Sequence, residues 1–352
     1  MSDTLQADVT PPRTPDERVG RRSGLARLLA RPEAGALAGA IVIYLFFFIV
    51  APPFRSAGSL STVLYVSSVY GLMATPIALL MIGGEFDLSA GVAVTSAALA
   101  ASLFSYEFTV NVWVGVAAAL AVALAVGFLN GWIVVRTGIP SFLVTLGTFF
   151  MLEGLNLALT RTITNQVASP DISTIQGFNS AKEVFASSFT IGGLNINITV
   201  IYWIAFVLLA TWILLRSHIG NWIFSVGGNA PSARAVGVPV GRMKIGLFMA
   251  VGFMAWFTGM HVLFQFNTLQ SGNGVGNEFV YIIAAVVGGC LLTGGYGSAV
   301  GAAIGAFIFG MTNQGIVYAG WNPDWFTFFL GALLLGAILL NTYIRRRAEA
   351  AR

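Results

Sequence analysis

The chain has 352 residues, of which 57% are hydrophobic and only 9% are charged, and its formal net charge is +4. Soluble globular domains carry about 25% charged residues, so this composition excludes an ordinary water-soluble fold. The mean hydropathy of +0.82 points instead to one continuous membrane bundle. The chain has a single cysteine and no metal-ligand spacing, so we expect no cofactor, no metal and no nucleic-acid partner.

The first 34 residues differ from the rest of the chain. They contain several prolines, six arginines and five acidic residues, and no convincing signal-peptidase site follows the first apolar run. A segment with so little apolar surface is not expected to fold alone. We therefore divide the chain into a disordered cytoplasmic tail (1–34), a transmembrane domain (35–345) and a second cytoplasmic tail (346–352).

Long apolar runs fill the transmembrane domain. A helix needs about 20 residues to cross the ~30 Å hydrocarbon core of a bilayer. The runs are continuous rather than alternating, which favours helices over barrel strands. The sequence therefore predicts an all-α, polytopic transmembrane helix bundle of about ten spans. In chain order, the predicted spans cover residues 36–53, 62–82, 87–104, 112–135, 141–160, 197–215, 243–266, 278–293, 298–317 and 323–342.

Basic residues set the orientation of this bundle. An even number of spans puts both termini on one side. With the N-terminus inside, 15 of the 18 basic residues lie inside, and only Arg55, Arg161 and Lys182 lie outside. The positive-inside rule therefore predicts that both termini are cytoplasmic. The longest external segment is then 161–196, and the longest internal one is 216–242.

Two glycine-rich breaks share a pattern. One runs from Gly83 to Gly91 and the other from Gly288 to Gly297; each follows a predicted span and holds a glycine pair. Both spans run in the same direction, so a repeat would be an internal parallel one. Paired glycine-interrupted segments are typical of a transport pathway. Close helix packing explains such glycines equally well, and both interpretations stay open.

Few charged groups fall within the apolar runs, and buried charges usually have a function. Asp87 or Ser89 could cap the following helix, and Glu278 could be a first-turn acid. This scarcity of charge predicts a neutral, hydroxyl-rich solute. The candidate residues for a translocation path or gate are Gly83, Gly84, Glu85, Asp87, Ser89, Asn130, Glu278, Gly288, Gly289 and Asn313.

The internal segment 216–242 contains a predicted short helix. Asn229 suits the N-cap, Pro231 the first turn, and Gly237 the left-handed position after the last turn. A helix of about two turns is unstable alone, so it needs the bundle or a partner. It is either a docking helix or an amphipathic connector on the bilayer surface. The residues assigned to it are Asn229, Ala230, Pro231, Ser232, Arg234, Ala235 and Gly237.

Together these segments resemble the ribose/xylose/arabinose-type permeases of bacterial ABC importers, in a branched-chain amino-acid-permease-like superfamily. The resemblance covers residues 36–345. Residues 83–89 are similar to the family's G-G-x-D-L-S segment, with one extra residue before the aspartate. Residues 227–238 are similar to its G-x-N…A…A-x-x-x-G-I coupling segment. Residues 278–297 are similar to its E-L-x-x-I-A-A-V-V-x-G-G-x-x-x-x-G-G-x-G run, whereas Gln314 interrupts a possible Asn-Gly pair.

The resemblance implies a permease subunit in a bacterial inner membrane. Two copies, as a homodimer surrounded by membrane lipid, would line a path for a monosaccharide or related polyol. Cytoplasmic ABC ATPase subunits would dock on the helix at 229–238, and a periplasmic or lipid-anchored solute-binding protein would contact 161–196. The sequence has no G-x-x-x-x-G-K-[ST] motif, so ATP hydrolysis is expected on separate subunits and the chain is not an enzyme. The alternative is an ATP-independent secondary transporter or facilitative channel; a structural or sensory component is a third hypothesis.

Overall fold

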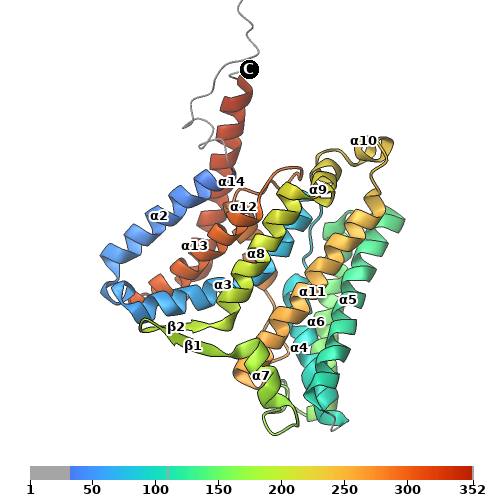
Figure 1. Ribbon diagram of the computed structural model, residues 1–352, viewed down its shortest axis with the longest axis vertical. Helices are drawn as coiled ribbons and strands as arrows, with labels where there is room; N and C mark the ends of the chain where they lie inside the picture. Colours follow the sequence, from blue (N-terminus) through green and yellow to red (C-terminus); the bar gives the residue numbers. More distant parts are fainter. Residues whose placement is uncertain (1–31, 109–110, 351–352) are drawn as a thin grey trace, which may run out of the picture.

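The computed structural model describes residues 32–108 and 111–350 of the chain. These residues form a helical bundle with short elements at both ends (Figure 1). The main helices are α2 (Pro32–Val50), α3 (Ala57–Ile82), α4 (Ala90–Glu107), α5 (Val112–Thr137), α6 (Ser141–Thr164), α8 (Ile198–Arg216), α11 (Val240–Phe266), α12 (Asn277–Val287), α13 (Ala299–Tyr318) and α14 (Trp325–Ala350). The shorter elements are η2 (Pro52–Arg55), α7 (Phe178–Ala186), β1 (Ser188–Ile191), β2 (Leu194–Asn197), α9 (His218–Gly228) and α10 (Ala230–Ala235).

A helix occupies each of the ten predicted segments, but the number of full-length spans differs. In the described ranges, seven helices are long and apolar enough to cross a membrane: α2, α3, α5, α6, α8, α11 and α13. The predicted continuous span at 278–293 is wrong, because α12 stops at Val287, before the glycine pair. The apolar part of α14 is also short, Trp325–Ala337. The polytopic helical architecture is confirmed.

The predicted tails overlap the first and last described helices. Residues 1–31, most of the predicted N-terminal tail, lie outside the described residues, and α2 already begins at Pro32. At the other end, α14 continues to Ala350, so most of the predicted tail 346–352 is helical. The transmembrane domain from 35 to 345 stays a prediction.

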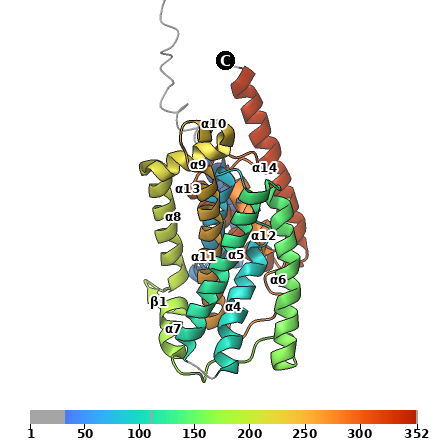
Figure 2. The ribbon, with the colours of Figure 1, turned by 90° about the vertical axis from the view of Figure 1, so that its right-hand side faces the viewer.

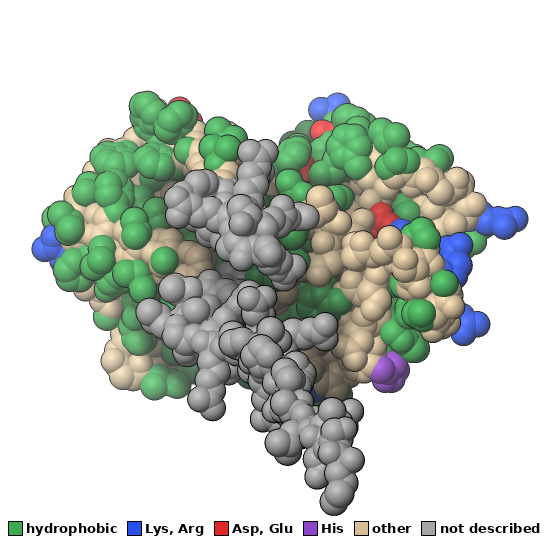
Figure 3. All heavy atoms as spheres, turned by 90° about the horizontal axis from the view of Figure 1, so that it is seen from above, with side chains coloured by type: hydrophobic (Ala, Val, Ile, Leu, Met, Phe, Trp, Pro, Cys, Tyr) green, Lys and Arg blue, Asp and Glu red, His purple; other side chains and the backbone are tan. Residues whose placement is uncertain are grey.

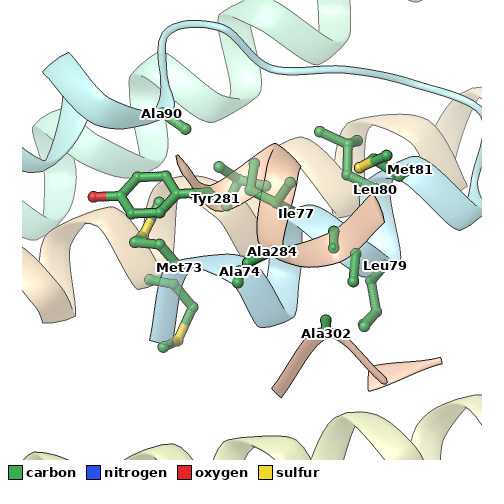
Figure 4. Packing of buried hydrophobic residues seen from close by; sticks show 14 of the residues in the cluster. Met73, Ala74, Ile77, Leu79, Leu80, Met81, Ala90, Tyr281, Ala284 and Ala302 are labelled. Atoms are coloured by element: carbon green, nitrogen blue, oxygen red, sulfur yellow. The ribbon is translucent and has the colours of Figure 1, made fainter. Parts of the chain in front are cut away.

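The core lies around α3, which is buried along most of its length. It packs against α8, α11, α12 and α13, and α11 packs in turn against α4 and α5. Figure 4 shows Met73, Ile77 and Leu80 of α3 beside Tyr281 and Ala284 of α12. The peripheral helices α2, α6 and α8 bury only a minor part of their length inside the bundle. This distribution suits a bundle whose outer face contacts lipid.

The predicted all-α class misses a small antiparallel hairpin. Strands β1 and β2 pair with Ser188 opposite Asn197, and Gly192 and Gly193 form the turn with φ of 58° and 83°. Two residues with positive φ are what a tight hairpin turn of matching twist requires. The sequence does contain a signal for this hairpin: a Gly-Gly pair lies between two short segments, 188–191 and 194–197, in which polar and apolar residues alternate. The hairpin and α7 lie at the end of the bundle opposite α9 and α10 (Figures 1 and 2).

Candidate translocation and coupling site

Helix α10 has the local structure that the sequence predicts. The Asn229 side chain accepts the backbone N–H of Ser232 at 2.9 Å, as an N-cap does. Gly237 follows the helix with φ of +88°, a conformation that costs a residue with a Cβ. Ala233 is buried against Val226 of α9 and Val240 of α11, whereas Val236 is 79% exposed. The helix is therefore anchored on one side and free on the other.

Three glycine pairs meet where α9 ends, and we call Gly83, Gly84, Gly227, Gly228, Gly294 and Gly295 the glycine junction. A Cβ on Gly84 would lie 3.2 Å from the Cα of Gly227, and one on Gly294 would lie 2.7 Å from the Cα of Gly84. The backbone N–H of Gly295 donates to the carbonyl of Ile82 at 2.8 Å. Backbones can approach this closely only without side chains. The segment leading into α10 thus touches both glycine-rich breaks directly.

The two breaks also have the same backbone geometry. After α3, the N–H groups of Gly84 and Glu85 donate to the carbonyls of Met81 and Leu80. After α12, the N–H groups of Gly289 and Cys290 donate in the same pattern to the carbonyls of Val286 and Ala285. Gly84 and Gly289 have φ of 84° and 95°. Each helix therefore ends in a Schellman motif. This likeness is local, and a parallel repeat of the whole bundle stays a prediction.

An ion pair links the first break to helix α11. The Nζ of Lys244 contacts the Oε1 of Glu85, and the two side chains are 22% and 8% exposed. Lys244 is the fifth residue of α11, just past its first turn. Glu85 neutralises this partly buried positive charge. Figure 3 looks onto this end of the molecule and shows other Lys and Arg side chains around its rim.

Hydroxyl groups hold the extended chain between α3 and α4. The N–H of Phe86 donates to Ser141 Oγ, and the N–H of Leu88 donates to Thr145 Oγ1, each at 3.0 Å. Both hydroxyls belong to the first turns of α6. Non-helical backbone at membrane depth is tolerated only where the protein satisfies its polar groups, as it does here.

Three of the candidate path residues lie together in one buried hydrogen-bond network: Asp87, Ser89 and Asn130. Both the N–H and the hydroxyl of Ser89 donate to Asp87 Oδ1, at 2.8 and 2.6 Å. Asn130 Nδ2 donates to Ser89 Oγ at 3.0 Å, and Thr148 donates to Asn130 Oδ1 at 2.6 Å. Asp87 thus stabilises the turn before α4, and Ser89 makes no side-chain cap. These contacts give the network a structural role in this conformation.

Glu278 and Asn313 lie away from the glycine junction. Glu278 is buried, and its carboxylate accepts the N–H of Gly276 at the start of α12. Gly288 packs against Gly301 of α13, so it serves close helix packing. Asn313 instead lines a cavity of about 280 Å³ between α3, α4, α11, α12 and α13. Of the candidate residues, Gly83 and Gly84 therefore lie in the glycine junction, whereas Asn313 lies on the cavity wall.

Some residues of this site were not among the predicted ones. Lys244, Gly294, Gly295 and the cavity residues Tyr65 and Thr258 were all absent from the candidate set. Gly294 and Gly295 were visible as part of a glycine-rich run, but nothing in the sequence marks their contact with residues 82 and 227. A charged residue at an apolar helix start was the only signal for Lys244.

The fold and site define a polytopic helical membrane protein in which a loop helix contacts two glycine-broken helices. The chain belongs to the family described as "Branched-chain amino acid transport system / permease component", which it matches over residues 59–338. It is therefore a permease subunit of an ABC transporter and is not itself catalytic.

Curated relatives support this assignment along nearly the whole chain. The galactose/methyl galactoside import permease protein MglC of Escherichia coli (strain K12) is 29% identical over 90% of this chain and 96% of its own length. The ribose import permease protein RbsC of the same organism is 30% identical over 88% and 93%. The fructose import permease protein FrcC of Rhizobium meliloti is 27% identical over 86% and 83%. No solved structure matches the chain significantly.

Proposed function

We propose that this permease subunit forms the translocation path of an ATP-driven importer for a neutral monosaccharide or related polyol. The observation that carries the proposal is the contact of the α9–α10 segment with both helix breaks. Gly227 lies against Ile82 and Gly295, so α9 cannot move far without displacing both breaks. Close-packed interiors transmit such displacements rather than absorb them.

In this proposal α10 is the docking site for the ATPase. Its exposed side carries Arg234 and Val236, and its buried side is fixed to α9 and α11. ATP binding would draw the docked helices together, and the glycine junction would pass the movement to α3 and α12. Coupling between distant sites requires an element with two discrete arrangements, and the glycine junction would be that element.

The proposed topology places both termini on the cytoplasmic side of a bacterial inner membrane. Segment 161–196, which holds α7 and the hairpin, would then face the solute-binding protein. Its loop is tied to residues 267–271 by backbone bonds such as Ser169 N–H to the Leu269 carbonyl at 2.8 Å. A second copy of the chain would complete the path. The sugars named for the three relatives favour a monosaccharide as the cargo.

The test is solute uptake by the reconstituted permease, ATPase and solute-binding protein. Arg234→Glu and Gly237→Val should abolish ATP-dependent uptake while the permease stays folded, because one changes the docking charge and the other strains a positive-φ turn. A matched control is Gly138→Val, which strains a positive-φ turn outside the coupling segment. Full uptake by both coupling variants would show that α10 does not dock the ATPase.

A further inference from the structure

The cavity that Asn313 lines has the dimensions of a small-molecule site. Its volume of about 280 Å³ is close to the lower end of the ~300–1,000 Å³ typical of ligand pockets. Five helices contribute to its wall, as does the loop that precedes α12. All of the residues that line it belong to one copy of the chain.

One buried hydroxyl on this wall lacks a hydrogen bond. Thr258 of α11 is 1% exposed, and its Oγ1 has no partner among the described residues. Most threonines in these helices bond a carbonyl one turn earlier, as Thr75 does with Gly71 at 2.8 Å. A buried hydroxyl left unpaired costs about 1–3 kcal/mol. Thr258 therefore brings an unused hydrogen-bonding group to the wall of the cavity.

A second hydroxyl on the wall has its direction fixed by a relay. The Nδ1 of buried His261 lies 2.8 Å from the carbonyl of Phe185, which can only accept, so Nδ1 carries the proton. In the neutral ring Nε2 is then an acceptor, and Tyr65 donates its O–H to it at 3.2 Å. The lone pairs of the Tyr65 oxygen stay free to accept a hydrogen bond from a solute hydroxyl.

The other lining groups are aromatic rings, amides and small hydroxyls. Tyr70 and Tyr281 lie side by side with ring centroids 6.1 Å apart, and Figure 4 shows the Tyr281 hydroxyl directed away from the aliphatic core. Asn273, Asn277 and Asn313 supply amide donors and acceptors. No described residue that lines the cavity is charged. Aromatic faces beside neutral donors and acceptors suit a polyhydroxylated ring and reject an ion.

We propose that each copy of the chain holds its own binding site for a neutral polyhydroxylated solute in this cavity, with Thr258 and Tyr65 as recognition residues. The inference rests on the proposed function for the identity of the cargo. It adds that the solute is recognised inside one subunit, not only between two subunits or by the solute-binding protein.

The test compares three variants of the full chain. Uptake is measured in the complex with its ATPase and binding protein, and solute binding is measured on the permease alone. Thr258→Val removes the unpaired hydroxyl without changing shape, and Val69→Phe fills the cavity, which Val69 lines. Thr75→Val is the matched control, because Thr75 is also buried but lies outside the cavity wall. Saturation-transfer NMR on the permease alone measures binding of D-galactose, D-ribose, D-fructose and myo-inositol, with D-gluconate as the charged comparison.

At least one neutral probe should bind the unaltered permease, and D-gluconate should not. For that probe, Thr258→Val should weaken binding between about twofold and tenfold, the value of one neutral hydrogen bond, without lowering thermal stability. Val69→Phe should abolish both binding and uptake. Unchanged uptake in both variants would overturn the inference, as would probe binding that both variants retain. If the α10 variants still abolish that uptake, the proposed function stands without the cavity site.

Discussion

Gly227→Ala is the substitution that most directly perturbs the glycine junction. The added Cβ would lie 2.7 Å from the backbone nitrogen of Gly295 and would overlap the carbonyl oxygen of Ile82. Ordinary carbon–oxygen contacts are about 3.3–3.6 Å, so the two backbone segments must separate. That separation breaks the bond from the Gly295 N–H to the Ile82 carbonyl, which is 2.8 Å long.

Two costs add in this variant. Overpacking a well-filled interior costs about 1–3 kcal/mol, and losing a hydrogen bond costs about 1 kcal/mol. We therefore expect the free energy of unfolding to fall by about 2–4 kcal/mol. Uptake per folded permease should also fall, because the substitution opens the contact of Gly227 with Ile82 and Gly295, which links α9 to both breaks.

Gly228→Ala is the matched control, in the next position of the same helix. A Cβ there meets no described atom within 4 Å, and alanine favours a helix by up to about 1 kcal/mol. Thermal unfolding of the purified permease and ATP-dependent uptake are measured on both variants. If Gly227→Ala matches Gly228→Ala in both assays, the junction carries no mechanical role and the reasoning is wrong.

Three further predictions concern the same end of the molecule and its topology. Glu85→Gln should lower the free energy of unfolding by about 1–3 kcal/mol, because the partly buried Lys244 charge loses its partner; adding Lys244→Met should restore stability, and additive losses would contradict this. Asn229→Ala should remove the N-cap of α10, costing about 1 kcal/mol locally, and should weaken ATPase binding in a pull-down assay, whereas intact binding would argue against docking there. In a cysteine-free background, single cysteines at Gly193 and Val236 should react with impermeant maleimides from opposite sides of the membrane; labelling from one side would refute the topology.

The sequence was sufficient to predict features that depend on neighbouring residues. The caps at Asn229 and Gly237 act over a few positions, so α10 could be predicted with its boundaries. The same holds for the long apolar helices, whose length and composition are local properties. The length of α12 was mispredicted because apolar residues continue past Gly288 and Gly289, and the backbone conformation of the pair ends the helix.

Features that depend on contacts between distant residues could not be predicted. The junction joins residues 82–84, 227–228 and 294–295, and no periodicity links these positions. Asn130 was selected only because it is polar in an apolar run, whereas its partners Ser89 and Thr148 belong to other elements. The cavity was also invisible, since its lining comes from five helices and most of its residues are ordinary helix components.

In the proposed mechanism, a separate ATPase drives solute movement through this chain by way of α10. The most direct measurement is uptake of a radiolabelled panel of D-galactose, D-ribose, D-fructose and myo-inositol into vesicles. It compares the permease alone with the complex of permease, ATPase and solute-binding protein. We expect at least one sugar or polyol to accumulate, and to do so only with the complete complex and only in the presence of ATP. Uptake of the same solute by the isolated chain in ATP-free vesicles would contradict this mechanism.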